Sequence, residues 1–558
     1  MKKRLILGVF IFLVCLFLAS CSFNLSDYIN TGNNTNNTNN NSNNNNNNNN
    51  NQDPNNQEPN NQNIELEDGE QILTIIEAND VHGYIMQDED GRNGISNMAY
   101  LINNIREDVG ENNVLLIANG DMFQGTGLVR MSFGQVMIDV MGEMGFDATC
   151  LGNHEFDWDL PVILKYFDGN IDNGEAKFPL VNSNVYQDGK LVIDQNICET
   201  AIFEKAGVKV GLIGYIGDVK SSINALFADK YEFKTNFENL TKRLALSLKD
   251  SGADIIVVSI HDGDTSGVSS FDVNKTLANL KDGDNYLIDA VINGHTHTYQ
   301  DGAISRSGGV AMPVVQSNGY RSSYLYSFGR IDLTIKDKKV TGYSTSHLHA
   351  SDAKDNYDEK VEDVLDAYFE RDKETLTKTI VNSTSTISRY SDKTYDWVSG
   401  VMLASTGADI AICNTGGLRS NIVSGKLTFE DLYQFNPFDN YIIIHELSSN
   451  LIRQFLTENE GYYFYSTKTG QIESNKTYKV AIIDYVYYSR YYNYYRNKGA
   501  NAVTTDLIVR DILIEDLSLR QSFNVFLDYA PVIGNKIGNK YSGYHIIYIE
   551  EERWYLYL

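Results

Sequence analysis

The first half of the chain alternates short apolar runs with longer stretches whose apolar residues recur every three or four positions. The short runs, rich in Val, Ile and Leu, predict buried strands at residues 73–76, 114–117, 148–151, 255–258 and 287–292. The longer stretches predict helices at residues 97–106, 133–144, 237–249 and 272–280. This order predicts an α/β fold in which helices flank layered sheets.

Polar residues able to bind metal follow each apolar run. They are Asp80 and His82, then Asp121, Asn153, His261, His295 and His297. In open α/β sheets, ligand sites form at the carboxyl ends of strands. Asp80 and His82 are two positions apart, so both side chains point to one side of an extended segment. We therefore expect these side chains to meet at one site.

The candidate ligands are nitrogen and oxygen donors without a thiolate. Such a set suits Zn, Mn, Co or Fe rather than a Cys-rich structural zinc site. Taken alone, a histidine beside a strand is more often a core or surface group, and Gly-Asp is commonly a turn. However, five of the nine histidines fall within these strand-end motifs, His154 among them. Chance placement explains that grouping poorly.

The amino terminus predicts a targeting segment. Lys2, Lys3 and Arg4 precede an apolar stretch at 5–18 that is too short for a comfortable membrane span. The small residues before Cys21 resemble a bacterial lipoprotein signal, which implies a signal peptide at 1–20 and lipid on Cys21. An uncleaved signal anchor is the alternative. Either reading places the body of the protein outside the cytoplasm, anchored to a membrane.

Composition distinguishes the segment after the signal from the rest of the chain. Residues 21–70 are rich in Asn and cannot form a core, so we expect a disordered tether. The net charge of −27 argues against a nucleic acid duplex as a partner, because duplex affinity comes from Lys and Arg. It does not conflict with a phosphate substrate where metal ions supply positive charge. Cys150, Cys198 and Cys413 are predicted to be buried thiols rather than disulfide partners.

The strand-end motifs resemble the five motifs of calcineurin-like metallophosphoesterases, and in detail those of the 5′-nucleotidase family. That family includes UDP-sugar hydrolases and 2′,3′-cyclic phosphodiesterases. The resemblance is carried by residues 79–83, 120–125, 152–157, 259–263 and 294–297. It implies a catalytic domain of two sheets flanked by helices at 71–350, a linker helix at 351–379 and a smaller α+β substrate-binding domain at 380–520. Residues 521–558 extend past the usual end of the family and receive no assignment.

The resemblance also implies two divalent metal ions, Zn, Mn, Co or Fe. One would be held by Asp80, His82, Asp121 and His297, and the other by Asp121, Asn153, His261 and His295. His154 is then the catalytic histidine, oriented by Asp157. The alternative for Asp157 is that it only caps the following turn.

Two stretches of the second half resemble the substrate-binding segments of the family. The residues implied in substrate binding are Asn414, Gly416, Gly417, Arg419 and Phe438, with Arg389 as a looser match. The ring of Phe438 is expected to stack on a base. The second stacking aromatic of the family follows a glycine turn that is absent here. Tyr492 and Tyr494 are candidates for it, unless the tyrosines of 485–495 alternate across an ordinary strand or helix.

The implied function is hydrolysis of nucleotides to nucleoside and phosphate outside the cytoplasm, for salvage of both. Two alternatives stay open. The same metals could serve 2′,3′-cyclic nucleotides or nucleotide sugars, or the protein could be a non-catalytic surface-binding lipoprotein. The complete set of ligands argues against the last alternative.

Overall fold

The computed structural model describes residues 20–22, 66–87, 93–263, 271–319 and 326–522. The expected signal peptide apart from Ser20, most of the expected tether and the extension beyond Ser522 lie outside the described residues. Within the described residues, no helix is both long and apolar enough to cross a membrane.

The first domain contains two seven-stranded sheets. One has the order β19 (Lys339–His349), β18 (Ser327–Lys336), β2 (Glu70–Ala78), β3 (Val114–Asn119), β4 (Ala148–Cys150), β5 (Leu180–Val181) and β8 (Ile197–Cys198). The other has the order β1 (Ser20–Ser22), β9 (Thr200–Lys205), β10 (Val208–Ile216), β12 (Ile255–His261), β15 (Ala290–Asn293), β17 (Met312–Gln316) and β16 (Gln300–Ile304). Smaller pairings join β6 (Val185–Gln187) to β7 (Lys190–Leu191) and β11 (Tyr231–Phe233), and β13 (Lys281–Asp282) to β14 (Asn285–Tyr286).

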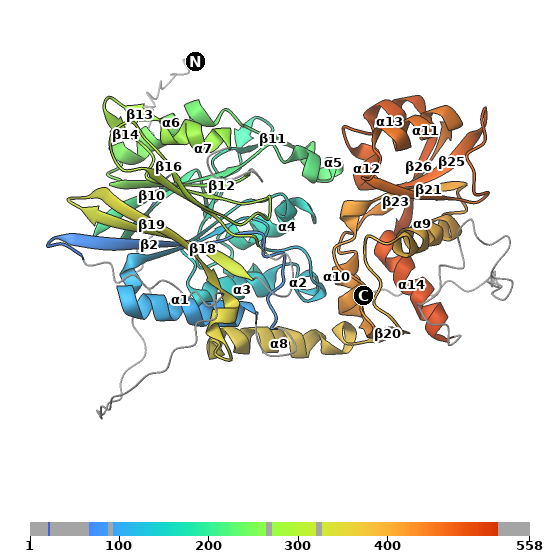
Figure 1. Ribbon diagram of the computed structural model, residues 1–558, viewed down its shortest axis with the longest axis horizontal. Coiled ribbons are helices and arrows are strands. Elements are labelled where there is room, and N and C mark those ends of the chain that lie inside the picture. The colour runs from blue at the N-terminus through green and yellow to red at the C-terminus, as the bar shows by residue number, and fades with distance from the viewer. Residues whose placement is uncertain (1–19, 23–65, 88–92, 264–270, 320–325, 523–558) are drawn as a thin grey trace, which may run out of the picture.

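The two large sheets pack face to face, and helices cover their outer faces (Figure 1). Leu73 and Ile75 of β2 lie in the core between the sheets, whereas Ile76 packs on the helical side. This alternation follows from the two-residue period of a strand. The flanking helices are α1 (Ile95–Val109) and α3 (Gln135–Met144) on one side, and α6 (Phe237–Asp250) and α7 (Asp272–Ala278) on the other. The predicted α/β layered class is confirmed.

The parallel strands of both sheets direct their carboxyl ends to a common region. β2, β3 and β4 run parallel in one sheet, and β10, β12 and β15 run parallel in the other. Each predicted apolar run overlaps one of these strands, although β15 starts at Ala290 rather than at 287 and β4 ends at Cys150 rather than at 151. The loops after the strands therefore come together, as the sequence predicts.

The short strand β1 pairs in parallel with β9, with Ser20 opposite Thr200 and Ser22 opposite Ile202. This placement differs from a tether that begins at residue 21. Backbone hydrogen bonds to the open edge of a sheet account for the difference.

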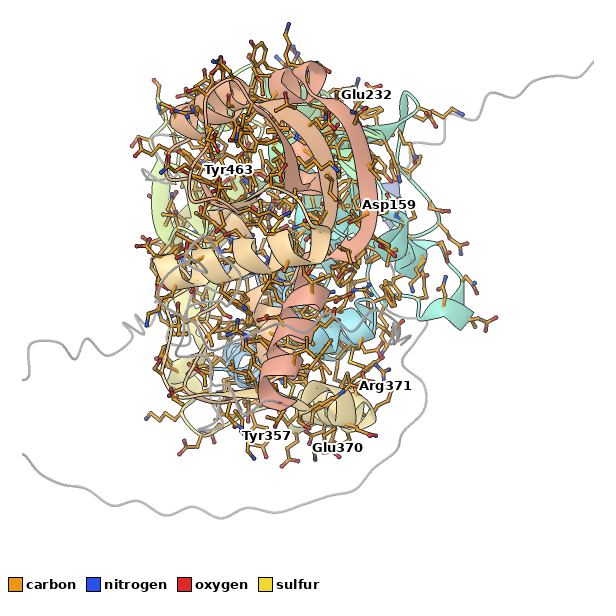
Figure 2. All side chains as sticks on the ribbon, turned by 90° about the vertical axis from the view of Figure 1, so that its right-hand side faces the viewer. Asp159, Glu232, Tyr357, Glu370, Arg371 and Tyr463 are labelled. Atoms are coloured by element: carbon orange, nitrogen blue, oxygen red, sulfur yellow. The ribbon has the colours of Figure 1, made fainter. Side chains whose placement is uncertain are left out.

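Helix α8 (Glu359–Leu376) joins the two domains (Figure 1). Asp358 caps its amino-terminal end, because the Asp358 carboxylate accepts hydrogen bonds from the backbone amides of Lys360 and Val361. Its apolar face buries Val361, Leu365 and Leu376, while its outer face exposes Glu370 and Arg371 (Figure 2).

The second domain is built on a five-stranded sheet and has one core. The strand order is β24 (Tyr463–Thr467), β21 (Ile410–Asn414), β25 (Thr477–Ile483), β23 (Tyr441–Ser448) and β26 (Ala500–Ile508). Helices α9 (Asp392–Thr406) and α14 (Val509–Ser522) lie below the sheet in Figure 1, and α11 (Ser449–Glu458) and α13 (Asn493–Lys498) lie above it. Helix α12 (Asp484–Tyr488) lies at the side that faces the first domain. The strands β20 (Thr379–Ser383) and β22 (Gly425–Thr428) pair beside α10 (Phe429–Phe435).

All three cysteines of the described residues from 66 onward are free and buried, which confirms the prediction of buried thiols for Cys150, Cys198 and Cys413. Burial raises the pKa of Cys150 to about 12, so this thiol stays protonated.

Candidate metal and catalytic site

Five of the seven predicted metal ligands have a left-handed backbone conformation. They are Asp80 (φ 53°), His82 (φ 51°), Asp121 (φ 56°), His295 (φ 76°) and His297 (φ 49°). Residues other than glycine rarely adopt positive φ, and such strain concentrates at functional sites. The strand-end loops thus bend sharply, and the bend directs the side chains into a shared space.

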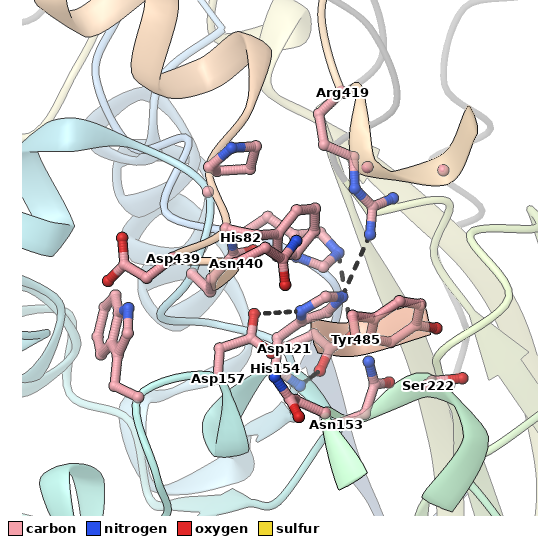
Figure 3. Close-up of a pocket in the computed structure, with 18 of the residues that line it drawn as sticks. His82, Asp121, Asn153, His154, Asp157, Ser222, Arg419, Asp439, Asn440 and Tyr485 are labelled. Carbon is pink, nitrogen blue, oxygen red and sulfur yellow. Dashed lines mark hydrogen bonds and ion pairs between the residues drawn. The ribbon is translucent and has the colours of Figure 1, made fainter. Parts of the chain in front are cut away.

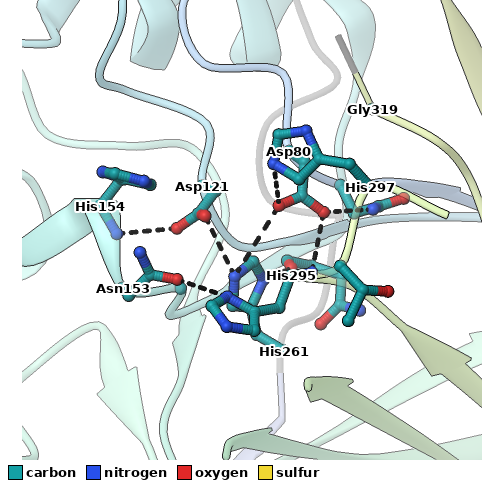
Figure 4. Close-up of polar contacts among 12 residues, drawn as sticks. Asp80, Asp121, Asn153, His154, His261, His295, His297 and Gly319 are labelled. Carbon is teal, nitrogen blue, oxygen red and sulfur yellow. Dashed lines mark hydrogen bonds and ion pairs between the residues drawn. The ribbon is translucent and has the colours of Figure 1, made fainter. Parts of the chain in front are cut away.

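The predicted ligand atoms converge in two groups (Figure 4). In the first, His297 Nε2 lies 3.2 Å from Asp80 Oδ1 and 2.9 Å from His82 Nε2. In the second, His261 Nε2 lies 3.2 Å from Asp121 Oδ2, and His295 Nδ1 lies 2.7 Å from Asn153 Oδ1. Asp121 Oδ2 is also 4.0 Å from His82 Nε2, so its carboxylate lies between the groups. The structure therefore brings all seven predicted ligands together.

The site fits divalent cations. Asp80 Oδ1 and His261 Nε2 are buried, and among the described residues they approach only other predicted ligands rather than a hydrogen-bond partner outside the set, which leaves both atoms available to a metal ion. Burial disfavours a charge on His261, but Asp121 and Asp80 outweigh burial and raise the pKa of His261 to about 10. The carboxylates of Asp80 and Asp121 thus favour a positive charge beside His261, as a bound cation would provide.

A buried glutamate that is absent from the predicted site residues joins two ligand loops. Glu155 accepts hydrogen bonds from the backbone amides of Gly152 (2.6 Å), Asp121 (2.9 Å) and Met122 (2.8 Å). The carboxylate thus holds the loop after β3 against the loop after β4. Its position inside the 152–157 motif was the available signal.

The imidazole of His154 contacts groups from both domains. Its Nδ1 lies 2.7 Å from Asp157 Oδ2, and its Nε2 lies 3.4 Å from an Nη of Arg419. The backbone amide of His154 donates to Asp121 Oδ1 at 2.7 Å. Burial opposes protonation, but the carboxylates of Asp157 and Asp121 outweigh it and raise the pKa of His154.

A cavity of about 700 Å³ opens in front of His154 and is lined by both domains (Figure 3). All six predicted substrate residues line it, namely Arg389, Asn414, Gly416, Gly417, Arg419 and Phe438. Phe438 stacks on His154 with ring centroids 5.9 Å apart. The guanidinium of Arg389 is engaged with its own domain, because it donates to the carbonyl oxygen of Leu418 at 3.0 Å.

The expected second aromatic residue is neither Tyr492 nor Tyr494. Tyr492 is buried in the domain core, where its hydroxyl lies 2.7 Å from His445 Nε2. Tyr494 is exposed on α13 and does not line the cavity. Tyr485 of α12 lines it instead, because the chain here turns into two short helices.

Besides the approach of Arg419 to His154, four polar contacts hold the second domain against the first. Arg130 donates to Asp439 Oδ2 at 3.0 and 3.1 Å, and the amide of Gly127 donates to Glu430 at 3.2 Å. Near α5 (Ala225–Ala228), Asn224 donates to Asp484 at 3.0 Å, and the hydroxyl of Tyr485 donates to the carbonyl oxygen of Ser221 at 3.0 Å. We call these four the interdomain contacts, and they join the two domains beside the cavity.

The fold and site define a metal-dependent phosphoesterase. The family model of calcineurin-like phosphoesterases matches residues 73–299, and that of the 5′-nucleotidase C-terminal domain matches residues 375–470. The chain belongs to this family of two-domain phosphoesterases.

Several relatives share both domains. The 5′-nucleotidase of Vibrio cholerae is 24% identical over 429 residues, covering 69% of this chain and 75% of the relative. The protein UshA of Escherichia coli is 23% identical over 429 residues, covering 69% and 76%. Among solved structures, the 5′-nucleotidase precursor of Thermus thermophilus superposes with a TM-score of 0.65 at 19% identity, covering 81% of this chain and 97% of the other. The 5′-nucleotidase of Candida albicans gives 0.59 at 14% identity, covering 80% and 98%.

Proposed function

We propose that the protein is a 5′-nucleotidase that hydrolyses nucleotides to nucleoside and phosphate outside the cytoplasm. One observation carries the proposal. The metal-type ligands and His154 from the first domain face the same cavity as Arg419 and Phe438 from the second. A phosphate and its nucleoside can therefore contact both domains at once.

Seven side chains would hold two metal ions. Asp80, His82, Asp121 and His297 form one set, and Asp121, Asn153, His261 and His295 form the other. When bound, the ions would supply positive charge to phosphoryl oxygens and lower the pKa of a water molecule.

His154 is the proposed catalytic residue among the groups that are not ligands. Asp157 accepts a hydrogen bond from its Nδ1, which fixes the ring and leaves Nε2 facing the cavity. Nε2 can then stabilise charge that develops on the phosphoryl oxygens, which is most of the catalytic task in phosphoryl transfer. Arg419 offers a planar pair of donors to the same oxygens.

The proposed domain plan has a catalytic domain at 71–350, a linker at 351–379 and a substrate-binding domain at 380–520. We further propose that lipid on Cys21 anchors the protein to a membrane surface. The sequence of residues 1–21 supports this anchor.

A panel of substrates tests the function. Purified protein loaded with Mn²⁺, Co²⁺ or Zn²⁺ should release phosphate from AMP faster than it cleaves 2′,3′-cyclic AMP or a UDP-sugar. Faster cleavage of either of the last two would assign the corresponding alternative. Bound metal without cleavage of any phosphoester would indicate a binding protein instead.

A further inference from the structure

Asp80 and His297 come from opposite sheets and yet meet at one place, where His297 Nε2 lies 3.2 Å from Asp80 Oδ1 (Figure 4). Asp80 follows β2 of one large sheet, whereas His297 follows β15 of the other. Both residues have a positive φ, of 53° and 49° respectively. A backbone in such a conformation persists only where surrounding groups fix it. Groups outside the ligand sets therefore hold both loops in place.

The carboxyl end of β17, the strand beside β15, supplies one of these groups. Gln316, the last residue of β17, is fully buried. Its side-chain amide donates to Thr296 Oγ1 at 2.7 Å and to the carbonyl oxygen of Thr298 at 2.8 Å. These two threonines flank His297 in the chain. Burying an amide costs free energy unless hydrogen bonds offset it, and both bonds of this amide go to the loop that carries His297.

The next residue, Ser317, reaches the loop that carries Asp80. Its backbone amide donates to Asn79 Oδ1 at 3.1 Å, and its hydroxyl donates to the same oxygen. The side-chain amide of Asn79 donates in turn to the carbonyl oxygen of Ser317 at 3.2 Å and to Asp80 Oδ2. Asn79 is fully buried, and its side chain links Ser317 to the carboxylate of a proposed metal ligand.

The backbone after Ser317 packs directly on Asp80. A Cβ atom at Gly319 would lie 2.5 Å from Asp80 Cβ and 2.6 Å from the Asp80 carbonyl oxygen, so the approach requires glycine. The amide of Ser317 also donates to Glu77 Oε1 of β2 at 2.8 Å, which fixes the end of β17 against the other sheet. Residues 316–319 thus contact both ligand loops, and we call them the β17 support.

The two groups of proposed ligands depend on different supports. The first ligand set is Asp80, His82, Asp121 and His297, and the second ligand set is Asp121, Asn153, His261 and His295. In the second set, His261 Nδ1 lies 2.7 Å from the carbonyl oxygen of Asn119, and the amide of Asp121 donates to Glu155 at 2.9 Å. Of the second set, His295 alone shares a loop with the β17 support. Loss of that support should therefore affect the first set more than the second.

We propose that Gln316 and Asn79 are positioning residues for the metal ion of the first ligand set. Gln316 positions His297 through the loop on either side of it, and Asn79 positions the carboxylate of Asp80. The inference rests on the proposed metal-dependent function of this same site. Groups that hold a metal ligand from outside are typically worth about 10- to 100-fold in metal affinity.

Isothermal titration calorimetry of the metal-free protein with Mn²⁺ tests this role. His82→Ala removes a ligand of the first set alone and Asn153→Ala a ligand of the second set alone, so these two variants assign the binding events. Gln316→Met and, separately, Asn79→Leu keep a similar side-chain volume but remove the hydrogen bonds. In each, affinity at the first set should fall about 10- to 100-fold, and the fall at the second set should be about tenfold smaller.

Asn182→Leu is the matched control. Asn182 is also a buried amide just after a strand, and it donates to the carbonyl oxygens of Val185 and Val192 on a loop without proposed ligands. This variant should leave both metal affinities unchanged, and its melting temperature measures the general effect of removing such an amide. Equal losses at the two sets, or unchanged affinity at the first set in both Gln316→Met and Asn79→Leu, would overturn the positioning role. A parent protein that binds fewer than two metal ions would instead overturn the two-ion assignment of the proposed function, and the inference with it.

Discussion

Phe438 of the second domain lies over His154 of the first, with ring centroids 5.9 Å apart and ring planes inclined by 28°. Arg419, from the same domain as Phe438, lies over the Phe438 ring at 5.2 Å and reaches Nε2 of His154. Asp157 of the first domain thus orients the His154 ring, and Phe438 of the second domain lies over one face of that ring. Changes to chemistry and changes to recognition should therefore be separable by mutation.

His154→Ala should lower kcat by a factor of about 10²–10³, the scale of losing one charge-stabilising donor. Both metals should stay bound, because His154 is outside the proposed ligand sets. Asp121→Ala is the contrasting variant and should lose metal as well as activity. Steady-state kinetics with AMP and metal analysis of both variants make the comparison. Loss of metal from His154→Ala would contradict the proposed roles.

Glu155→Gln should weaken metal binding by about 10- to 100-fold, the usual effect of removing an outer partner of a metal ligand. The reason is geometric, because three backbone amides converge on this carboxylate and an amide side chain cannot accept from all of them. Isothermal titration calorimetry with the metal ion measures the change in affinity. Glu143→Gln, an exposed position on α3, is the matched control. Unchanged affinity in Glu155→Gln would show that the loops hold their positions without this carboxylate.

Arg130→Ala should loosen the docking of the second domain. The substitution removes the ion pair between Arg130 and Asp439, which joins the two domains, and it also removes the guanidinium that lies over the Phe133 ring. We expect KM for AMP to rise about two- to fivefold, the scale of losing one partly exposed ion pair, with a larger radius of gyration in X-ray scattering. Arg371→Ala, which breaks an exposed pair within α8, serves as control and should change neither quantity. Equal behaviour of the two variants would count against an interdomain role for Arg130.

Asp484→Asn should change how stability depends on pH. Burial raises the pKa of Asp484 to about 6, although hydrogen bonds from Asn224 and backbone amides partly offset it. Because the folded state binds this proton more tightly than the unfolded state, the stabilisation is present below the unfolded pKa and is lost as pH rises through about 6. Between pH 5 and pH 8 the free energy of unfolding of the parent should fall by about 1–1.5 kcal/mol relative to that of Asp484→Asn. Thermal melts at the two pH values measure it, and a constant difference would contradict the assignment.

Cys21→Ser should abolish incorporation of labelled fatty acid in cells. Nucleotidase activity of the purified body should stay intact, since the cavity lies in residues far along the chain. Gel fluorography of cells expressing either protein measures the label. Label retained in Cys21→Ser would mean that residues 1–21 do not act as a lipoprotein signal.

The strands and ligand identities were predictable because they rest on local sequence. Each ligand comes directly after an apolar run, and parallel strands carry their ends to one region. The left-handed conformations of Asp80 and His82 were not predictable, because nothing in an Asp or His side chain requires them. The placement of Tyr485 beside the cavity depends on how the two domains pack together, and the residues that meet there are far apart in the sequence. Residue periodicity carries no information on that relationship, which is why Tyr492 and Tyr494 were the wrong candidates.

The interdomain contacts also affect how turnover would be timed. They lie on both sides of the cavity, at α2 (Gly127–Met131) and near α5, so the two domains can separate only when all of them break. Separation of two whole domains moves solvent, whereas bond cleavage inside a closed cavity does not. At saturating substrate, kcat should then fall as glycerol or sucrose raises the viscosity of the solvent. In Arg130→Ala this dependence of kcat on viscosity should be weaker. Domain separation against solvent friction, rather than cleavage of the phosphoester, would then be the rate-limiting step.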